Sequence, residues 1–324
     1  SDVAKPSRVK PNSATTNSAT SNHGKHLLLF ALTCVTTFLS GSGLGDDFDL
    51  SQGLFFSGTL MTILLCHEMG HYVVARMHGI PASLPYFIPL PPVISLGTLG
   101  AVIQMDEPIE DRNKLVDVGA AGPLAGLCAA IPLLIYGLSL STVAATPPDE
   151  GAMLEGNSLL YLGLKYLVHG QMLPTAEGLD VQLHPMAFAS WVGLLLTMIN
   201  LLPIGQLDGG HILCGAIGEK HERVSRWLHW LLLAVGLLVA AILTLEYMGE
   251  GMAFGDALLT GGKAGLPWCV WAGMLLYMRR MAGGTYHPPV GNTPLSPSRK
   301  WLVVVLFFVL ILIFTPIPLR EALP

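Results

Sequence analysis

Several long, nearly uncharged apolar stretches constrain this chain of 324 residues more than any other feature. A helix needs about 20 consecutive apolar residues to cross the hydrocarbon of a bilayer. Only 12% of the residues are charged, whereas about a quarter are charged in a soluble domain. We therefore expect an all-α polytopic membrane protein with about six to seven transmembrane helices. The net charge of −5 and the lack of a basic patch indicate no nucleic-acid partner.

Apolar length alone places seven candidate spans, the sixth of which is interrupted at its start by Gly265 and Pro267. The spans are about 26–44, 54–77, 115–140, 185–204, 224–247, 264–281 and 300–317. Residues 1–25 are rich in Ser, Thr, Asn and Pro, which cannot bury a core, so we expect a disordered tail. The transmembrane domain would cover 26–317 and leave 318–324 as a short C-terminal tail, while the amphipathic segment within 141–184 would lie on the outer face.

Positive charge orients these spans, because Lys and Arg accumulate in cytosolic loops. If the N-terminus is cytosolic, all Lys and Arg residues except Lys165, Lys263 and Arg320 fall on the cytosolic side. The loops on the far side are acidic. The second and fourth spans then both run from outside to inside, and both carry polar residues toward the cytosolic face.

The second span contains LLCHEMGHYV at 64–73, in which ionisable side chains interrupt an apolar helix. Such groups are costly in hydrocarbon and mark functional sites. Because positions four apart share one helix face, His67 and His71 present two imidazoles to one point, with Glu68 beside them. This HExxH spacing is typical of a zinc site with a glutamate that activates water. The alternative is a pair of buried histidines bonded to neighbouring helices.

A catalytic zinc ion usually takes three protein ligands and leaves one position for water. We expect the third ligand in NLLPIGQLDGGH at the end of the fourth span, where Pro203 and Gly205 break the helix. Asp208 is the favoured candidate and His211 is the second. One Zn²⁺ per chain, together with the carboxylates of Asp208 and Glu68, gives a nearly neutral cluster, which a low-dielectric site tolerates.

Residues 79–105 are apolar and proline-rich, and we expect them to form a partly membrane-embedded β-hairpin with a strand over 98–105. The alternative is a cytosolic loop packed on the bundle. A strand with a free edge can pair with an unwound substrate and expose its peptide bonds. Asn200, eight residues before Asp208, is a candidate donor to a substrate carbonyl or an oxyanion, or else a partner for helix-end backbone. The glycines of 119–126 permit close helix packing or shape a cleft.

Three motifs in this order resemble the site-2 protease family of intramembrane zinc metalloproteases: HEMGH at 67–71, GAAGPLAG at 119–126 and NLLPIGQLDGG at 200–210. The resemblance covers about residues 53–215, the expected core. It implies cleavage of membrane-spanning substrates within the bilayer, with His67, His71 and Asp208 as zinc ligands and Glu68 as catalytic base, and it favours a catalytic role for Asn200. It also implies that the segment from 97 clamps the substrate through Gly97, Thr98, Leu99, Gly100, Ala101, Val102, Ile103 and Gln104.

The expected partners are a transmembrane protein substrate and the lipid bilayer itself, in a bacterial cytoplasmic or a plastid membrane. The sequence carries no indication of an oligomeric state. The competing function is a metal-ion transporter that uses the same His and Asp cluster as a transit site. A transporter does not need a glutamate next to the first ligand or an apolar edge strand. A catalytically inactive scaffold is a third hypothesis, against which the intact ligand set argues.

Overall fold

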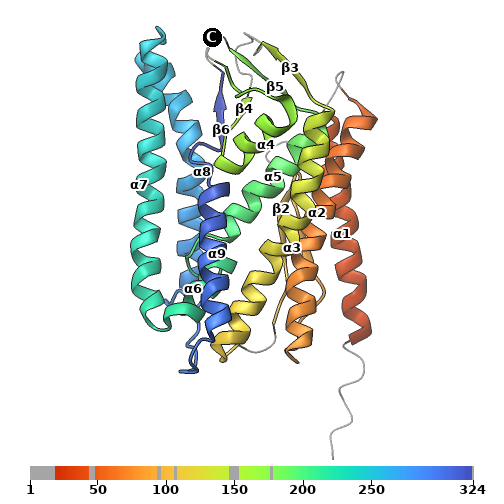
Figure 1. Ribbon diagram of the computed structural model, residues 1–324, viewed down its shortest axis with the longest axis vertical. Helices are drawn as coiled ribbons and strands as arrows, with labels where there is room; N and C mark the ends of the chain where they lie inside the picture. Colours follow the sequence, from red (N-terminus) through yellow and green to blue (C-terminus); the bar gives the residue numbers. More distant parts are fainter. Residues whose placement is uncertain are drawn as a thin grey trace, which may run out of the picture.

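The computed structural model describes residues 19–43, 48–92, 96–105, 108–145, 153–175 and 178–322. Within these ranges the chain forms nine helices, most of which run along the long axis of the molecule, and three two-stranded sheets (Figure 1). The helices are α1 (Ala19–Ser42), α2 (Leu50–Met77), α3 (Arg112–Ser139), α4 (Leu159–His169), α5 (Pro185–Asn200), α6 (Asp208–Ile217), α7 (Lys220–Gly249), α8 (Phe254–Met281) and α9 (Pro297–Ile313). The strands are β1 (Tyr86–Pro89), β2 (Thr98–Val102), β3 (Thr142–Ala145), β4 (Met153–Glu155), β5 (Leu179–Gln182) and β6 (Leu319–Glu321).

Four of the described helices are long and apolar enough to cross a membrane, namely α2, α3, α7 and the part of α1 from His23 onward. The mostly helical, apolar fold with small sheets therefore agrees with the sequence. Helix α5 is apolar but has only 16 residues, and α9 has 17. Helix α8 runs through Pro267, where the sequence had suggested an interruption. Helix α1 begins before the expected start at residue 26, and the first 18 residues of the expected tail lie outside the described residues.

Carboxylate caps define where the two central helices begin. The side chain of Asp49 accepts hydrogen bonds from the backbone N–H groups of Ser51 and Gln52 at the start of α2. Asp111 does the same for Asn113 and Lys114 at the start of α3. Such caps satisfy backbone donors that have no partner inside the helix. They fix the ends of the two helices that carry the HExxH and glycine motifs.

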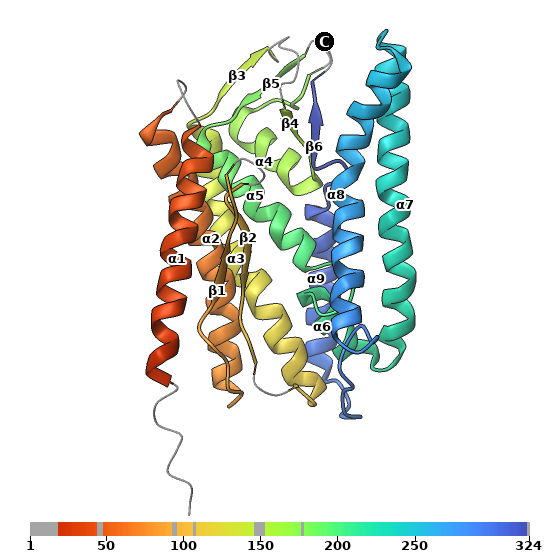
Figure 2. The same cartoon turned by 180° about the vertical axis from the view of Figure 1, so that it is seen from behind.

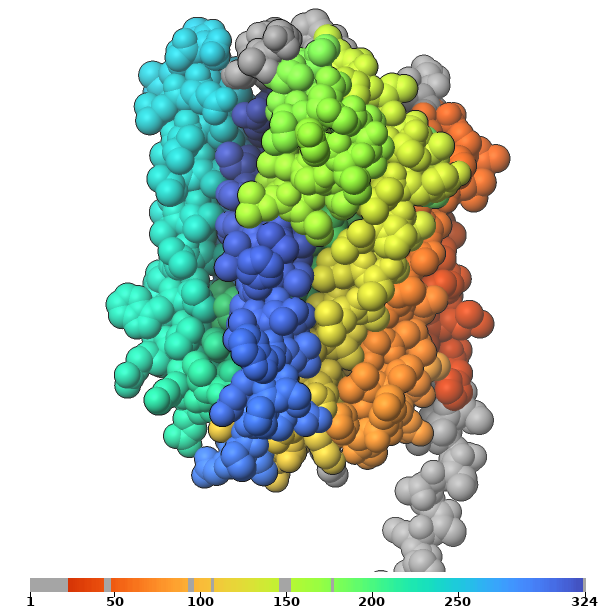
Figure 3. Space-filling model, in the orientation of Figure 1, coloured from red at the N-terminus to blue at the C-terminus, as the bar shows by residue number. Residues whose placement is uncertain are grey.

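The core of the molecule lies where α3 packs against α2, α5 and α6. Its side chains are mostly aliphatic, and Leu60 of α2, Leu134 of α3 and Met198 of α5 are fully buried there. Helix α9 lies over this core on the face seen in Figure 3, between α7 and α3. The α7–α8 pair packs mainly on itself, at one side of the bundle (Figure 1).

The expected β-hairpin is present as an antiparallel pair of β1 and β2, with Tyr86 opposite Val102. It runs along the helices and does not cap their ends (Figure 2). Helix α1 holds it in place, since Thr36 Oγ1 donates to the carbonyl of Gly97 at 2.6 Å and His26 Nδ1 lies 3.1 Å from the carbonyl of Pro85. The second strand ends at Val102, earlier than the expected residue 105.

Two small sheets that the sequence did not indicate lie at the end of the molecule where α2 begins (Figure 1). Strand β3 pairs with β5 inside the segment expected to be a surface helix region, and β4 pairs with β6 from the expected C-terminal tail. Between them, α4 contributes Lys165, whose fully buried ammonium lies 2.9 Å from Asp180 and 3.1 Å from Glu155. The amphipathic segment expected within 141–184 therefore does contain a helix, α4, but this helix is part of a packed cap.

Candidate metal centre

Helix α2 places the two histidines of HExxH on one buried face. Their Nε2 atoms are 3.2 Å apart, and the residues are 4% and 6% exposed. His71 Nδ1 lies 2.7 Å from the carbonyl oxygen of Val118 on α3. A carbonyl oxygen can only accept a hydrogen bond, so Nδ1 of His71 carries a proton, and Nε2 is the nitrogen available to a metal ion. This is the usual way in which an outer partner orients a metal-binding imidazole.

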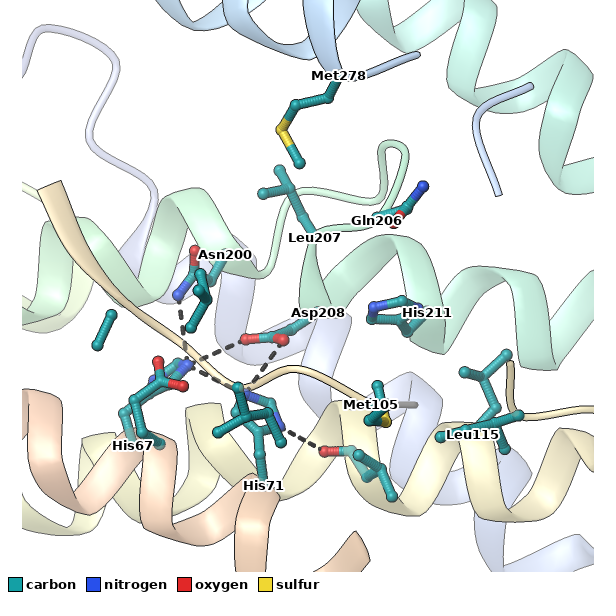
Figure 4. Close-up of a pocket in the computed structure, with 17 residues that line it drawn as sticks. His67, His71, Met105, Leu115, Asn200, Gln206, Leu207, Asp208, His211 and Met278 are labelled. Atoms are coloured by element: carbon teal, nitrogen blue, oxygen red, sulfur yellow. Dashed lines mark hydrogen bonds and ion pairs between the residues drawn. The ribbon is translucent and has the colours of Figure 1, made fainter. Parts of the chain in front are cut away.

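The break between α5 and α6 delivers Asp208 to the same point. The chain turns through Pro203 and Gly205, whose φ of +63° favours glycine, and Asp208 is the first residue of α6. Its Oδ2 lies 3.1 Å from His67 Nε2 and its Oδ1 lies 3.2 Å from His71 Nε2 (Figure 4). The three ligand atoms of His67, His71 and Asp208 all lie within 4.8 Å of one another.

The donor set fits a zinc ion. Two imidazole nitrogens and one carboxylate are among the ligand sets that zinc takes in catalytic sites. The Nε2 atom of His71 lies 3.2 Å from a carboxylate oxygen of Asp208, a spacing at which both atoms can coordinate one ion. His211, the second candidate ligand from the sequence, is not part of the cluster formed by the described residues.

The glycine motif on α3 forms the wall behind this cluster. A Cβ on Gly122 would overlap the imidazole of His71, and one on Gly126 would lie 3.1 Å from His67 Nδ1. A Cβ on Gly119 would lie 3.2 Å from the backbone oxygen of Asp208. The three glycines therefore let α3 approach all three candidate ligands. Of the two interpretations of this motif, close packing describes the contacts better.

Glu68 and Asn200 lie beside the cluster, on α2 and at the end of α5. Glu68 is 4% exposed and lines two cavities that meet at His67. The amide nitrogen of Asn200 lies 3.3 Å from His67 Nε2 and points toward the cluster (Figure 4). The structure thus brings together all five residues that the sequence predicted for zinc binding and catalysis: His67, Glu68, His71, Asn200 and Asp208. Their individual roles stay predictions.

Two cavities meet at the cluster. The metal cavity, of about 170 Å³, is lined by His71, Asp208 and His211 among others, and the apolar cavity, of about 230 Å³, by Ile63, Leu196 and Trp271 among others. The two cavities share seven lining residues, which are His67, Glu68, Ala101, Val102, Asn200, Leu207 and Met278.

The expected substrate-contacting segment divides between these cavities and the scaffold. Ala101 and Val102 line both cavities, Leu99 and Gly100 line the apolar cavity, and Ile103 lines the metal cavity. The other three residues have packing partners instead. Gly97 contacts α1, Thr98 Oγ1 donates to the carbonyl of Ile88, and the backbone of Gln104 pairs with that of Ser83.

Sequence reasoning missed the α8 side of these cavities. Trp271, Met274 and Met278 of α8 line the apolar cavity, and Met278 faces the cluster across Leu207 (Figure 4). These residues lie in an apolar span in which no polar motif singles them out, so the sequence offered no signal for them. The sequence also gave no spacing that would connect His211 with His287, whose rings lie side by side.

Comparison with known proteins agrees with this site. Residues 55–243, more than half of the chain, match peptidase family M50. The chain is 31% identical over 264 residues to the probable zinc metalloprotease EGY1, chloroplastic, of Arabidopsis thaliana, which covers 80% of this chain and 42% of that protein. It is 35% identical over 179 residues to the probable zinc metalloprotease EGY2, chloroplastic, of the same plant, covering 53% of this chain and 30% of that protein.

A third relative, the probable zinc metallopeptidase EGY3, chloroplastic, of Arabidopsis thaliana, is 26% identical over 299 residues, covering 81% of this chain and 50% of its own length. The chain thus spans half or less of the length of these relatives. The matched region contains all three motifs and every candidate ligand. The chain belongs to peptidase family M50, the site-2 protease family.

Proposed function

We propose that this chain is an intramembrane zinc metalloprotease that hydrolyses peptide bonds in or near transmembrane segments of membrane-protein substrates. The observation that carries the proposal is the convergence of His67, His71 and Asp208 within 4.8 Å, at the meeting point of two cavities. Membership of family M50 and the zinc metalloprotease names of the relatives support it.

His67, His71 and Asp208 would hold the zinc ion. Bound zinc supplies Lewis-acid polarisation of a peptide carbonyl and lowers the pKa of water. The Glu68 carboxylate accepts the proton of the attacking water and then passes it to the leaving amine nitrogen. The Asn200 amide donates a hydrogen bond to the carbonyl oxygen as negative charge develops on it. The hydrogen bond from His71 Nδ1 to Val118 fixes the ring before the substrate arrives.

Strand β2 would hold the substrate in extended form. Among the described residues β2 pairs only with β1, which leaves its other edge without a paired strand. Leu99 to Ile103 line the two cavities beside that edge. A transmembrane helix hides its peptide bonds, and pairing with an edge strand exposes them. The remaining residues of the segment, Gly97, Thr98 and Gln104, would position the strand through their scaffold contacts.

We also propose that the chain crosses the membrane seven times, with the N-terminus in the cytosol. Three crossings, formed by α5 together with α6, by α8 and by α9, would add to those of the four long apolar helices. The end of α2, the starts of α3 and α7, the end of α8 and the start of α9 all lie at one end of the molecule (Figure 1). Arg76, Arg112, Lys220, Arg280 and Lys300 belong to these helix ends, which supports a cytosolic placement. The chloroplastic names of the relatives support a plastid membrane over the bacterial alternative.

The test compares wild-type protein with Glu68→Gln and with the control Glu246→Gln, which lies at the exposed end of α7. Zinc content is measured together with cleavage of a transmembrane reporter in detergent. We expect one zinc per chain in all three, and loss of cleavage by a factor of about 10² to 10⁴ in Glu68→Gln only. Absence of cleavage in all three forms, with zinc flux into proteoliposomes that Glu68→Gln retains, would instead support the transporter, which no observation favours at present.

A further inference from the structure

A histidine from outside the family motifs contacts His211, which lines the metal cavity. His287 lies in the segment between α8 and α9, and its Nε2 is 2.7 Å from Nδ1 of His211 on α6. The two rings meet edge to face, with centroids 4.9 Å apart. The contact joins α6 to the segment that follows α8, a distant part of the chain.

The protons of this pair can be assigned from its partners. His287 Nδ1 lies 2.7 Å from the carbonyl oxygen of Pro288, which can only accept, so Nδ1 carries the proton. Burial lowers the pKa of His287, and the hydrogen bond to Pro288 only partly opposes this shift. The lowered pKa leaves the ring neutral near pH 7. Its Nε2 is then an acceptor, and Nδ1 of His211 must donate to it. The Sγ atom of Cys214 lies 3.5 Å from the same nitrogen, Nδ1 of His287.

This assignment decides the chemistry of His211. With Nδ1 of His211 protonated and engaged, the Nε2 atom of the neutral ring keeps a lone pair. His211 lines the metal cavity but not the apolar cavity. His211 lies beyond His71, on the side away from His67 (Figure 4). Helix α2 runs from His67 to His71 toward the end that the proposed orientation places in the cytosol. His211 therefore lines the part of the cavity that a substrate's cytosolic flank would fill.

We propose that His287 is a positioning residue for substrate selection: it fixes His211 so that Nε2 of His211 accepts a hydrogen bond from a donor side chain of the substrate, on the cytosolic side of the scissile bond. The preferred substrates carry a donor such as Asn, Ser or Thr there, next to an apolar segment that fills the apolar cavity. This inference rests on the proposed protease function and specifies the substrate class of the same site.

The first experiment measures substrate preference. Transmembrane reporters that carry either Asn or Leu at each of the first few residues on the cytosolic side of the cut are cleaved by wild type, His287→Gln and His287→Leu. Gln offers an oxygen acceptor near the position of Nε2, whereas Leu offers none. A buried acceptor left unpaired discriminates strongly, so we expect about a 10-fold or greater preference in kcat/KM for Asn at one position. Wild type and His287→Gln should show it, and His287→Leu should lose it while its kcat for the Leu reporter stays unchanged.

The second experiment reads the proton positions without any cleavage. Nitrogen NMR of protein labelled in its histidines, with the signal assigned by loss in His211→Asn, reports which nitrogen of His211 is protonated. We expect Nδ1 in wild type and His287→Gln, and a mixture of the two neutral forms in His287→Leu, with zinc content unchanged in all three. Protonation at Nε2 in the wild type, or an Asn preference that survives His287→Leu, overturns the inference. Absence of cleavage in every form, with the expected proton on Nδ1, contradicts the proposed function and leaves the His287–His211 assignment standing.

Discussion

At the scale of single residues, the candidate metal centre depends on how closely α3 approaches the histidines of α2. Val118 orients His71 through its carbonyl, and the next helical turn places Gly122 directly against the same ring. Only a residue without a Cβ fits there, because the ring cannot move without losing either the Val118 bond or its place in the cluster. The glycine motif and the HExxH motif are therefore two halves of one packing arrangement.

This packing predicts that Gly122→Ala disrupts the centre. The added methyl group would overlap His71 and displace it, at a cost of about 1–3 kcal/mol of stability from overpacking. We expect loss of bound zinc and a lower melting temperature in detergent. The matched control is Gly58→Ala on α2, where a Cβ meets no atom within 4 Å. Full zinc occupancy in Gly122→Ala would show that α3 does not restrict the imidazole.

The sequence predicted those site residues that belong to a local pattern, such as a helical spacing or a helix break. The four-residue interval of His67 and His71 places them on one face, and the helix break at Pro203 and Gly205 indicated Asp208. It was uninformative about residues that act through tertiary contacts. His287 meets His211 only because the chain after α8 folds back onto α6, and no local pattern encodes that return. Met278 is one apolar residue among many in its helix.

At the scale of secondary-structure elements, α1 acts as the support of the β1–β2 hairpin. Thr36 bonds the carbonyl of Gly97, and a Cβ on Gly97 would lie 2.5 Å from backbone atoms of Thr36 and Thr37. The hairpin's position along α2, and hence the place of β2 beside the cluster, follows from this contact. Helix α1 therefore contributes to the site without lining either cavity.

The variant Gly97→Ala should push the hairpin away from α1. Gly79→Ala is its matched control, since both glycines have positive φ, +87° and +72°, but a Cβ on Gly79 meets no atom within 4 Å. Each variant carries the cost of about 1–2 kcal/mol for a left-handed alanine, and only Gly97→Ala adds the clash. We expect kcat/KM to fall at least 10-fold in Gly97→Ala relative to Gly79→Ala, with zinc retained in both. Equal kcat/KM in the two variants would contradict the supporting role of α1.

The cap opposite the cytosolic end depends on a buried charge cluster. Lys165 of α4 is fully buried between Glu155, on β4, and Asp180, on β5, and Tyr161 packs against its ammonium. Removing one member of such a cluster leaves buried charges without a partner and costs about 3–5 kcal/mol. Lys263 pairs with Glu321 but its side chain is 66% exposed, so its pair contributes less than about 1 kcal/mol.

Lys165→Met should therefore lower the melting temperature of the purified protein strongly, and Lys263→Met should leave it nearly unchanged. The measurement is thermal unfolding in detergent, followed by circular dichroism. Similar melting temperatures for the two variants would mean that the cap does not depend on the buried ammonium.

Elements differed in how well the sequence predicted them. Long apolar helices and the proline-rich hairpin had clear patterns, and both are present. The pairs β3–β5 and β4–β6 had none, because their strands have only three or four residues, too few for an alternating pattern. Strand β6 forms by pairing with β4, about half of the chain away, which turned an expected tail into part of a sheet.

At the scale of the whole molecule, the proposal of seven crossings places the two ends of the described chain on opposite sides of the membrane. Epitope tags at the N-terminus, between Gly283 and Gly284, and at the C-terminus test this in sealed vesicles. We expect the first two tags to be accessible from the cytosolic face and the third from the other face. Accessibility of the loop tag and the C-terminal tag from the same face would show that α9 does not cross, and would reduce the number of spans.

The central claim, that one zinc ion binds between α2 and α6, is tested most directly by X-ray absorption at the zinc edge. The account predicts nitrogen and oxygen neighbours at about 2.0–2.2 Å in the wild type and no sulfur neighbour. It also predicts that Asp208→Ala loses an oxygen neighbour and most of the zinc affinity, whereas His211→Ala keeps both. A sulfur neighbour at about 2.3 Å, or a spectrum unchanged by Asp208→Ala, would contradict it.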